Sequence, residues 1–301
     1  MVAGIAGINP EVATLGSVTF ARYAVQVALQ YELDAREIPS NFTTGYVPFG
    51  VTTPNQYPTI LYGTEVFEVN VALRDLAIEF AKKAILNDSA EAIAYRANYA
   101  KASIYSAGAA PPGVVACDVA TSDVWYSGRI LSESFGKFTT LITNGSGIYC
   151  STAQEDNATL EVLVRAAKAG LVDFARAIVM RTASDFDRQY PGEEATTNLF
   201  WANQGGFEPS LQNIYLAGVK VVQGILEHWD STFAKGVKPT NYIGDILGTL
   251  GGTPDFGLGS AFGNNPIRKR EMSSLEQFTR KKVAMRKRGM GAIEVKRVEE
   301  A

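Results

Sequence analysis

The chain contains few of the residues that build metal sites, disulfide scaffolds or catalytic triads. Its 301 residues include two cysteines and one histidine. Two thiols are too few for a disulfide scaffold or a four-thiolate zinc site, although they allow one bridge between Cys117 and Cys150. The single histidine, His228, excludes a histidine-rich metal site and lies in a helical pattern that does not suit a Ser-His-Asp triad. We therefore expect no metal ion.

Long apolar runs are also missing. The most apolar stretch, Ile214 to Leu226, is interrupted by Lys220 and Gln223, so none approaches the ~18 residues of a membrane span. The first residues show no signal peptide, and we expect no transmembrane span in this chain. Four sequons would accept glycans only in a secreted or cell-surface protein, and they hint at that location: Asn41, Asn87, Asn144 and Asn157.

Positive charge is scarce outside the C-terminal region. Residues 266–301 hold 11 Lys and Arg against 5 Asp and Glu, which leaves 17 basic and 26 acidic residues in the rest of the chain. Because phosphate contacts need clustered Lys and Arg, this acidic body disfavours nucleic acid as a partner. Length and composition suit one large α/β domain. We expect that domain over residues 1–257 and a basic, poorly ordered tail over residues 258–301.

The stretch FARAIVMRTASDFDR, Phe174 to Arg188, combines a buried strand with a polar end. Its apolar run predicts a strand of a parallel sheet, and Ser184 and Asp185 follow where that strand ends. In open α/β sheets, ligands bind outside the carboxyl ends of the strands. A carboxylate with apolar walls behind it acquires a raised pKa, which suits general acid catalysis. With equal weight, Asp185 could instead cap the turn or helix that follows.

Two further apolar runs predict strands of the same sheet. VAGIAGI, Val2 to Ile8, ends in a turn where Gly7 lets a ligand approach the backbone, and Val114 to Val119 leads to Trp125. We expect these runs to lie next to the strand Phe174–Thr182 in a mostly parallel sheet, so that Gly7, Trp125 and Asp185 share one crevice.

A buried strand at the first residues suggests that strands upstream of it are missing. A parallel sheet rarely begins in its middle. We therefore expect the strand Val2–Ile8 to present an unpaired edge, which would favour aggregation or a homo-oligomer.

One motif connects the chain to a known superfamily. GIAGINPEVATLGSVTF resembles the glycine turn of the nucleoside phosphorylases and nucleosidases, with Ile8 and Ser17 replacing a glycine and an aspartate. Longer segments resemble the fungal purine nucleoside permeases over residues 2–256: GIAGINPEVATLGSVTFARYAVQVALQYE, NIYLAGV and VKPTNYIGDILGTLGGTPDFG. The resemblance implies a three-layer α/β/α fold that lacks its N-terminal strands, because those relatives carry a further N-terminal segment.

The resemblance also implies the residues of a purine nucleoside site. RTASD resembles the superfamily's Arg-x-x-Ser-Asp, which makes Asp185, beside Ser184, the residue that acts on a purine ring nitrogen. TSDVWY resembles Ser-Gly-Asp-Ala-Phe, which makes Trp125 the residue that stacks on the base. The backbone of Ala6 and Gly7 would border the pocket. Without the family match, Trp125 suits an ordinary core position equally well.

A third segment, Gln-Glu-Asp, resembles the Glu-Met-Glu whose carboxylate holds the ribose hydroxyls. Either Glu155 or Asp156 could fill that role, because the register is open. The alternative is that these carboxylates complement the N-terminus of the helix that follows, an effect worth ~0.3–1 kcal/mol.

Two functions suit these residues. The first is purine nucleoside binding in nucleoside uptake or salvage, as the permease resemblance implies. The alternative is cleavage of the N-glycosidic bond by phosphate or water, with Asp185 as general acid. No cofactor is expected, and phosphate is a candidate co-substrate that Ile5 disfavours, because some relatives carry a hydroxyl there. Both functions need the same pocket, so the sequence does not separate capture from catalysis.

Overall fold

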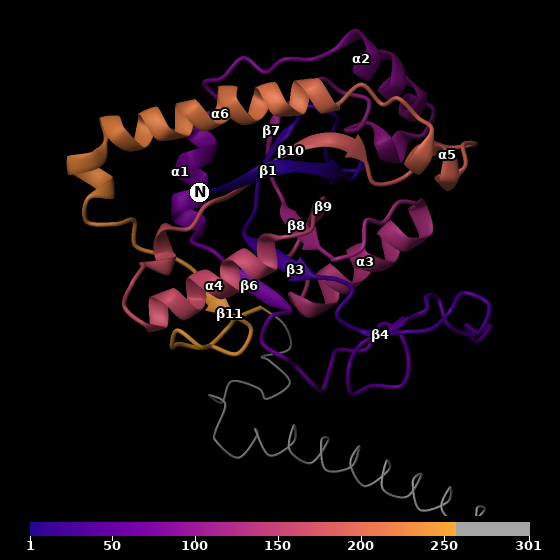
Figure 1. The fold of residues 1–301 in the computed structure, drawn as a ribbon, viewed down its shortest axis with the longest axis horizontal. Helices are drawn as coiled ribbons and strands as arrows, with labels where there is room; N and C mark the ends of the chain where they lie inside the picture. Colours follow the sequence, from indigo (N-terminus) through magenta and orange to yellow (C-terminus); the bar gives the residue numbers. More distant parts are fainter. Residues whose placement is uncertain (257–301) are drawn as a thin grey trace, which may run out of the picture.

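A nine-stranded sheet forms the centre of the computed structural model, in which residues 1–256 are described (Figure 1). The basic tail expected over residues 258–301 lies outside the described residues. Across the sheet the strands follow the order β11 (Gly244–Asp245), β6 (Val66–Glu68), β3 (Tyr23–Gln26), β8 (Asp118–Thr121), β9 (Tyr149–Ala153), β1 (Val2–Ile8), β10 (Val179–Phe186), β2 (Val18–Phe20) and β7 (Val114–Ala116). A separate ribbon pairs β4 (Tyr31–Glu32) with β5 (Tyr46–Val47).

The strands pair in both directions. Four pairs are parallel, namely β1 with β10, β2 with β7, β3 with β8 and β8 with β9. The other four pairs of the nine-stranded sheet are antiparallel, as is the separate β4–β5 pair. The parallel pairs include β1 and β10, the two longest strands, at the centre of the sheet. The α/β class is confirmed.

Helices cover both faces of the sheet, in a three-layer arrangement. Consecutive residues of β10 show this, because Met180 packs in the cluster of α1 (Val71–Ala81) and α6 (Phe207–Glu227), whereas Val179 packs with α4 (Asp156–Lys168). Figure 1 shows α6 and α4 on opposite sides of the strands. The remaining helical segments are α2 (Ala90–Arg96), α3 (Arg129–Ile142), α5 (Ala195–Phe200), the 3₁₀ turns Ala97–Lys101, Ser103–Tyr105 and Phe174–Arg176, and a π turn at Trp229–Phe233.

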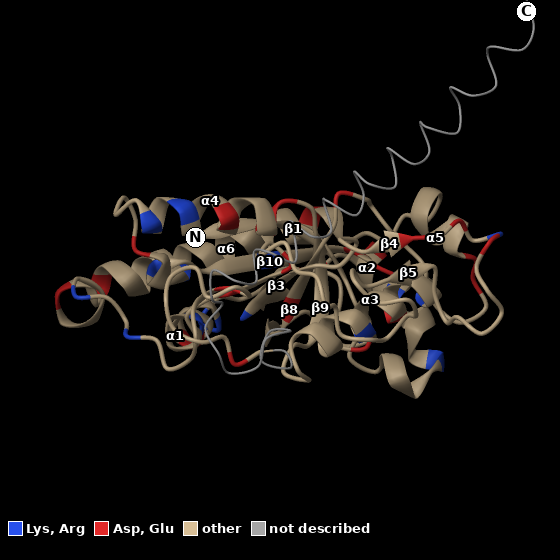
Figure 2. Cartoon of the chain, turned by 90° about the horizontal axis from the view of Figure 1, so that it is seen from below, with Lys and Arg blue, Asp and Glu red and all other residues tan. Residues whose placement is uncertain are grey.

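Between residues 1 and 256, none of the helices is both long enough and apolar enough to cross a bilayer. Figure 2 shows acidic and basic residues interspersed along the helices and loops.

The predicted adjacency of the strands was right for one pair. β1 does pair with β10. However, β9 separates β1 from β8, and the run Val114–Val119 is split between β7 and β8. The first strand pairs with β9 only through Gly7 and Ile8, whereas Val2–Ala6 pairs with β10 alone. The expectation of an unpaired edge is therefore wrong for the carboxyl end of β1 but describes residues 2–6, and association through this edge stays a prediction.

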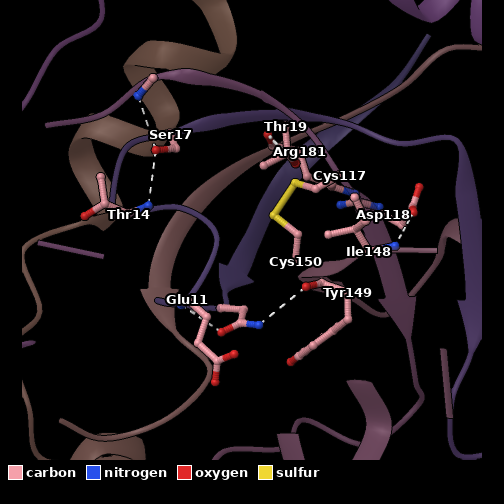
Figure 3. The surroundings of a disulfide bond; sticks show 12 residues. Glu11, Thr14, Ser17, Thr19, Cys117, Asp118, Ile148, Tyr149, Cys150 and Arg181 are labelled. Carbon is pink, nitrogen blue, oxygen red and sulfur yellow. Dashed lines mark hydrogen bonds between the residues drawn. A yellow bond between two sulfur atoms is a disulfide. The ribbon is translucent and has the colours of Figure 1, made fainter. Parts of the chain in front are cut away.

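A buried carboxylate explains the split strands. Asp118 is 3% exposed, and it accepts hydrogen bonds from the backbone N–H groups of Arg22 (2.9 Å), Tyr23 (2.8 Å) and Ile148 (2.7 Å). These bonds hold the bend between β2 and β3 and fix the start of β8. The apolar stretch over residues 18–27 therefore forms two strands, β2 and β3, rather than one. Beside Asp118, a disulfide joins Cys117 to Cys150 of β9 (Figure 3).

One of the four sequons is closed to modification in the folded chain. Asn157 is 5% exposed, its amide donates to the Thr64 carbonyl at 2.6 Å, and its side-chain oxygen accepts from Thr121. The sequons at Asn41, Asn87 and Asn144 are exposed.

Candidate functional site

A cavity of about 410 Å³ opens along the paired strands β1 and β10. It contains six of the seven residues predicted for the site. Its lining consists of Ala3, Gly4, Ile5, Ala6, Gly7, Val124, Trp125, Tyr126, Thr152, Ala153, Gln154, Glu155, Arg181, Ser184 and Asp185. Asp156 is the predicted residue that does not line it. The strands thus bring together residues that lie far apart in the sequence.

A bulge at the end of β10 shapes this cavity. Ala6 of β1 pairs with Ala183, whereas the next residue, Gly7, pairs with Asp185, so Ser184 is an extra residue on β10. Neighbouring residues of a regular strand point to opposite faces, but here both Ser184 and Asp185 line the cavity. The Ser184 hydroxyl lies 2.6 Å from Asp185 Oδ1 and 3.1 Å from the Ala6 carbonyl oxygen. The irregular pairing therefore turns a serine and a carboxylate toward one space.

Gly7 permits the close packing opposite the bulge. Its N–H donates to Thr152 Oγ1 at 3.1 Å. A Cβ at this position would lie 2.5 Å from Thr152 Oγ1 and 3.3 Å from Asp185 Oδ2. Any larger residue would displace the threonine and crowd the carboxylate, so glycine keeps Asp185 accessible from the cavity.

Asp185 holds its proton more tightly than an ordinary aspartate. Burial raises its pKa to about 6, an effect that the Ser184 hydrogen bond opposes and the nearby Asp187 carboxylate reinforces. Among the described residues its carboxylate accepts only the Ser184 hydroxyl and no backbone N–H of a following turn. Asp185 is therefore not a capping residue, and its free carboxyl edge faces the cavity.

Asp187 has a different, structural role. It is buried and accepts from Arg188 Nε at 2.8 Å and Nη2 at 2.9 Å, and from the Tyr149 hydroxyl. Of the two aspartates at the carboxyl end of β10, only Asp185 is open to a ligand.

The sequence left either Glu155 or Asp156 as the carboxylate for the ribose, and the structure distinguishes their surroundings. Asp156 begins α4 and is fully buried, where it accepts from Arg181 Nε at 3.1 Å and from Arg181 Nη2. Glu155 is the N-cap residue of that helix, with a side chain that is 66% exposed and lines the cavity. Its Oε2 lies 3.3 Å from Arg181 Nη2. Glu155 is therefore the carboxylate that can reach a bound ligand.

Arg181 is the first residue of the RTASD motif, but the sequence did not predict it as a site residue. Its guanidinium lies over β1, where a Cβ on Gly4 would overlap Nη1. Opposite charges favour its cationic form although burial opposes it, and the balance raises its pKa. The sequence offered one signal, a basic residue directly after the apolar run that begins this strand. Thr152 gave no comparable signal, because its role depends on the bend of β1.

Trp125 lies on the loop between β8 and α3, and its side chain is 62% exposed. This exposure excludes the core position considered from the sequence. The next residue, Tyr126, supplies the anchor: it is buried, packs edge-on against Phe135 with ring centroids 4.7 Å apart, and donates to the Tyr149 hydroxyl at 3.3 Å. The loop is thus held by one aromatic residue and presents the other to the cavity.

Two amide side chains connect this loop to the strand that carries Asp185. Gln204 accepts from the Phe186 N–H at 2.6 Å, and Asn198 donates to the Phe186 carbonyl at 3.1 Å. Asn198 also donates to Ser127 Oγ at 2.9 Å. The backbone just after Asp185 and the loop just after Trp125 are therefore tied to the same buried asparagine. Neither amide was predicted from the sequence as a site residue.

Solved structures are similar to this chain only at a low level. Among solved structures, a methylthioadenosine/S-adenosylhomocysteine nucleosidase from Campylobacter jejuni is 17% identical, covers 75% of this chain and 67% of its own, and has a TM-score of 0.35. The Neisseria meningitidis enzyme of the same name is 14% identical, covers 74% and 67%, and has a TM-score of 0.33.

The sequence relatives are much more similar. A Candida albicans protein named purine nucleoside permease is 48% identical over 262 residues, 85% of this chain and 64% of that protein. A Schizosaccharomyces pombe protein named probable purine nucleoside permease is 39% identical over 239 residues, 76% of this chain and 67% of that protein. The chain thus spans about two thirds of the length of these relatives. A sequence profile described as purine nucleoside permease matches residues 1–238, and the chain therefore belongs to the purine nucleoside permease family.

Proposed function

We propose that this domain binds purine nucleosides as part of their uptake. The observation that carries the proposal is that an exposed indole, a carboxyl group with a raised pKa and a second carboxylate face one cavity: Trp125, Asp185 and Glu155. An aromatic face suits a purine because base stacking is worth ~1–3 kcal/mol. Membership of a family whose relatives are named purine nucleoside permeases supports the same ligand class.

The positions of the lining residues define the orientation in which a nucleoside would bind. Arg181 and Asp185 of β10 pair with Gly4 and Gly7 of β1, which are three residues or ~10 Å apart along that strand. The base belongs at the Asp185 end, where a protonated carboxyl can donate to a ring nitrogen and Trp125 can stack on the ring. The ribose belongs at the Glu155 end, where a carboxylate can accept hydrogen bonds from the hydroxyl groups.

Cleavage of the nucleoside is a second candidate function, and one observation favours it. The raised pKa of Asp185, about 6, leaves the carboxyl group able to give its proton to the departing purine near neutral pH. In that reaction water adds to the anomeric carbon, the bond from that carbon to the purine nitrogen breaks, and the Asp185 proton passes to the ring. The attacking water loses one proton to solvent, and Asp185 takes up a proton from solvent after the base has left. Glu155 would hold the ribose hydroxyls in place.

Phosphate fits this reaction less well than water. Arg181 is the one cation among the described lining residues, and Asp156 and Glu155 already pair with it. A phosphate beside it would face two carboxylates without a free positive charge, so we propose water as the attacking group.

Titration calorimetry with inosine, adenosine and uridine tests the binding proposal. Both purine nucleosides should bind, whereas uridine, with a smaller ring to stack on Trp125, should bind at least about tenfold more weakly. Protein shown to be folded by circular dichroism that binds none of the three would overturn the proposal.

Chromatography of free base separates capture from cleavage. Inosine is incubated with the protein, with and without phosphate, beside the Asp185→Asn variant. Asparagine keeps the size of the side chain but supplies no proton at neutral pH. Under cleavage, base release from the parent protein falls by roughly 10²–10⁴ in the variant. Under capture, neither protein releases base.

A further inference from the structure

A second cavity continues from the first at Asp185. Its volume is about 640 Å³, and it shares four lining residues with the nucleoside cavity: Ile5, Trp125, Ser184 and Asp185. Its far wall is formed by α5, by the N-terminal end of α6 and by residues 202–206 between them. Asp185 and Trp125 therefore stand where the two cavities meet, rather than at a closed end.

The chemistry of this second cavity differs from that of the first. Besides the shared Asp185, its acidic lining residues are Glu91 and Glu208, and among its described lining residues there is no Lys, Arg or His. Neutral amides and apolar side chains make up much of the rest: Asn198, Asn203, Gln204, Leu199 and Phe207. Phe207 is 58% exposed and lines only the second cavity, so its ring is available to a ligand that extends into that cavity. A space of this kind suits a neutral or cationic group with an apolar part and repels an anion.

The direction of the bound nucleoside decides which part of it faces this space. With the ribose at Glu155 and the base at Trp125, the edge of the purine that meets Asp185 is also the edge that faces the second cavity. A group attached to that edge would pass Asp185 and enter the second cavity. A group attached to the ribose would start from the opposite end of the first cavity.

We propose that the second cavity receives a neutral or cationic substituent on the purine edge, such as a group on the exocyclic amine of an adenosine. This inference rests on the proposed function, because it takes the orientation of the nucleoside from it. The ligand class is thereby widened from simple purine nucleosides to base-modified ones, while nucleosides with an anionic group on the same edge are rejected by Glu91 and Glu208.

Three ligands in titration calorimetry test the proposal: adenosine, N6-benzyladenosine and N6-succinyladenosine. The benzyl compound should bind at least as tightly as adenosine, and the succinyl compound, with two carboxylates, about tenfold or more weakly. A benzyl compound that binds tenfold more weakly than adenosine would overturn the inference and leave the proposed function intact. Loss of adenosine binding itself would instead overturn the proposed function.

A variant that fills the second cavity provides an independent test. Ala202 lines the second cavity and not the first. Ala202→Phe should weaken N6-benzyladenosine about tenfold or more and change adenosine by less than about threefold, with Ala202→Ser as the matched control. Equal losses for both ligands, or no loss for either, would contradict the proposal.

Discussion

The two walls of the nucleoside cavity are built in different ways. The β1–β10 wall carries Gly7, Arg181 and Asp185 on paired strands, with backbone hydrogen bonds and a buried ion pair fixing each position. The loop wall carries Trp125 on a segment between β8 and α3, where Tyr126 packs into the core and Ser127 accepts one hydrogen bond from Asn198. Changes in the strand wall should therefore affect folding, whereas changes in the loop wall should mainly affect binding.

The largest effect is expected from Arg181→Met in the strand wall. The substitution leaves Asp156 buried without its cation, which typically costs 3–5 kcal/mol. Urea unfolding should show this loss of stability. The matched control is Arg165→Met, which removes an exposed pair with Glu161 on α4 and should change stability by less than about 0.5 kcal/mol. Similar losses in the two variants would remove the argument that the buried pair holds the wall.

A smaller effect is expected from Asp185→Asn, and it depends on pH. The folded pKa of about 6 lies above the usual value of about 3.9, so between pH 4 and pH 6 the folded state binds more protons than the unfolded state. Stability of the parent protein should then fall by about 2 kcal/mol as pH rises through this window. The variant should lack this part of the slope.

Unfolding curves measured at pH 4, 5, 6 and 7 provide the check for Asp185. The difference in unfolding free energy between variant and parent should grow in favour of the variant, steeply between pH 4 and pH 6 and by only a few tenths of a kcal/mol more by pH 7. A difference that is constant across the series would mean that the pKa of Asp185 is not raised in the folded protein.

A change in the loop wall should reduce ligand affinity and leave stability almost unchanged. Trp125→Ala should weaken adenosine binding by about 1–2 kcal/mol, because the stacking surface is lost. It should change stability by no more than about 0.5 kcal/mol, because the indole is 62% exposed. Trp201→Ala is the control, since Trp201 is 80% exposed and lines neither cavity. Equal changes in affinity for the two variants would show that Trp125 does not contact the base.

The smallest effect is expected where the two walls are joined. Ser127→Ala removes the hydrogen bond from Asn198 to the loop and leaves the bond from Asn198 to the Phe186 carbonyl. Adenosine affinity should fall about threefold through a higher dissociation rate, and stability should fall by about 0.5–1.5 kcal/mol. Stopped-flow fluorescence and urea unfolding measure the two quantities. An unchanged dissociation rate would indicate that Asn198 does not hold the loop.

The sequence predicted the parts of the site that local motifs encode. A polar end on an apolar strand pointed to Asp185, a glycine turn pointed to Gly7, and a family motif pointed to Trp125. All three line the same cavity. These features are readable because each depends on a few neighbouring residues.

The parts that sequence reasoning missed depend on contacts between distant segments. Asp118 reads as a polar residue within a single strand, but it binds three backbone N–H groups and divides that strand. The bulge at Ser184 arises from pairing with β1, and the role of Asn198 requires both α5 and the Trp125 loop in place. None of these leaves a periodic pattern in the sequence, since the partners are about ten to 180 residues away.

A crystal structure of this domain with adenosine bound tests the central claim most directly. The account predicts the purine ring against the Trp125 indole, a ring nitrogen or the exocyclic amine within hydrogen-bond distance of Asp185, and the ribose hydroxyls at Glu155. The edge of the base beside Asp185 should face the second cavity. Adenosine bound elsewhere, or bound with its ribose at Asp185, would contradict the account.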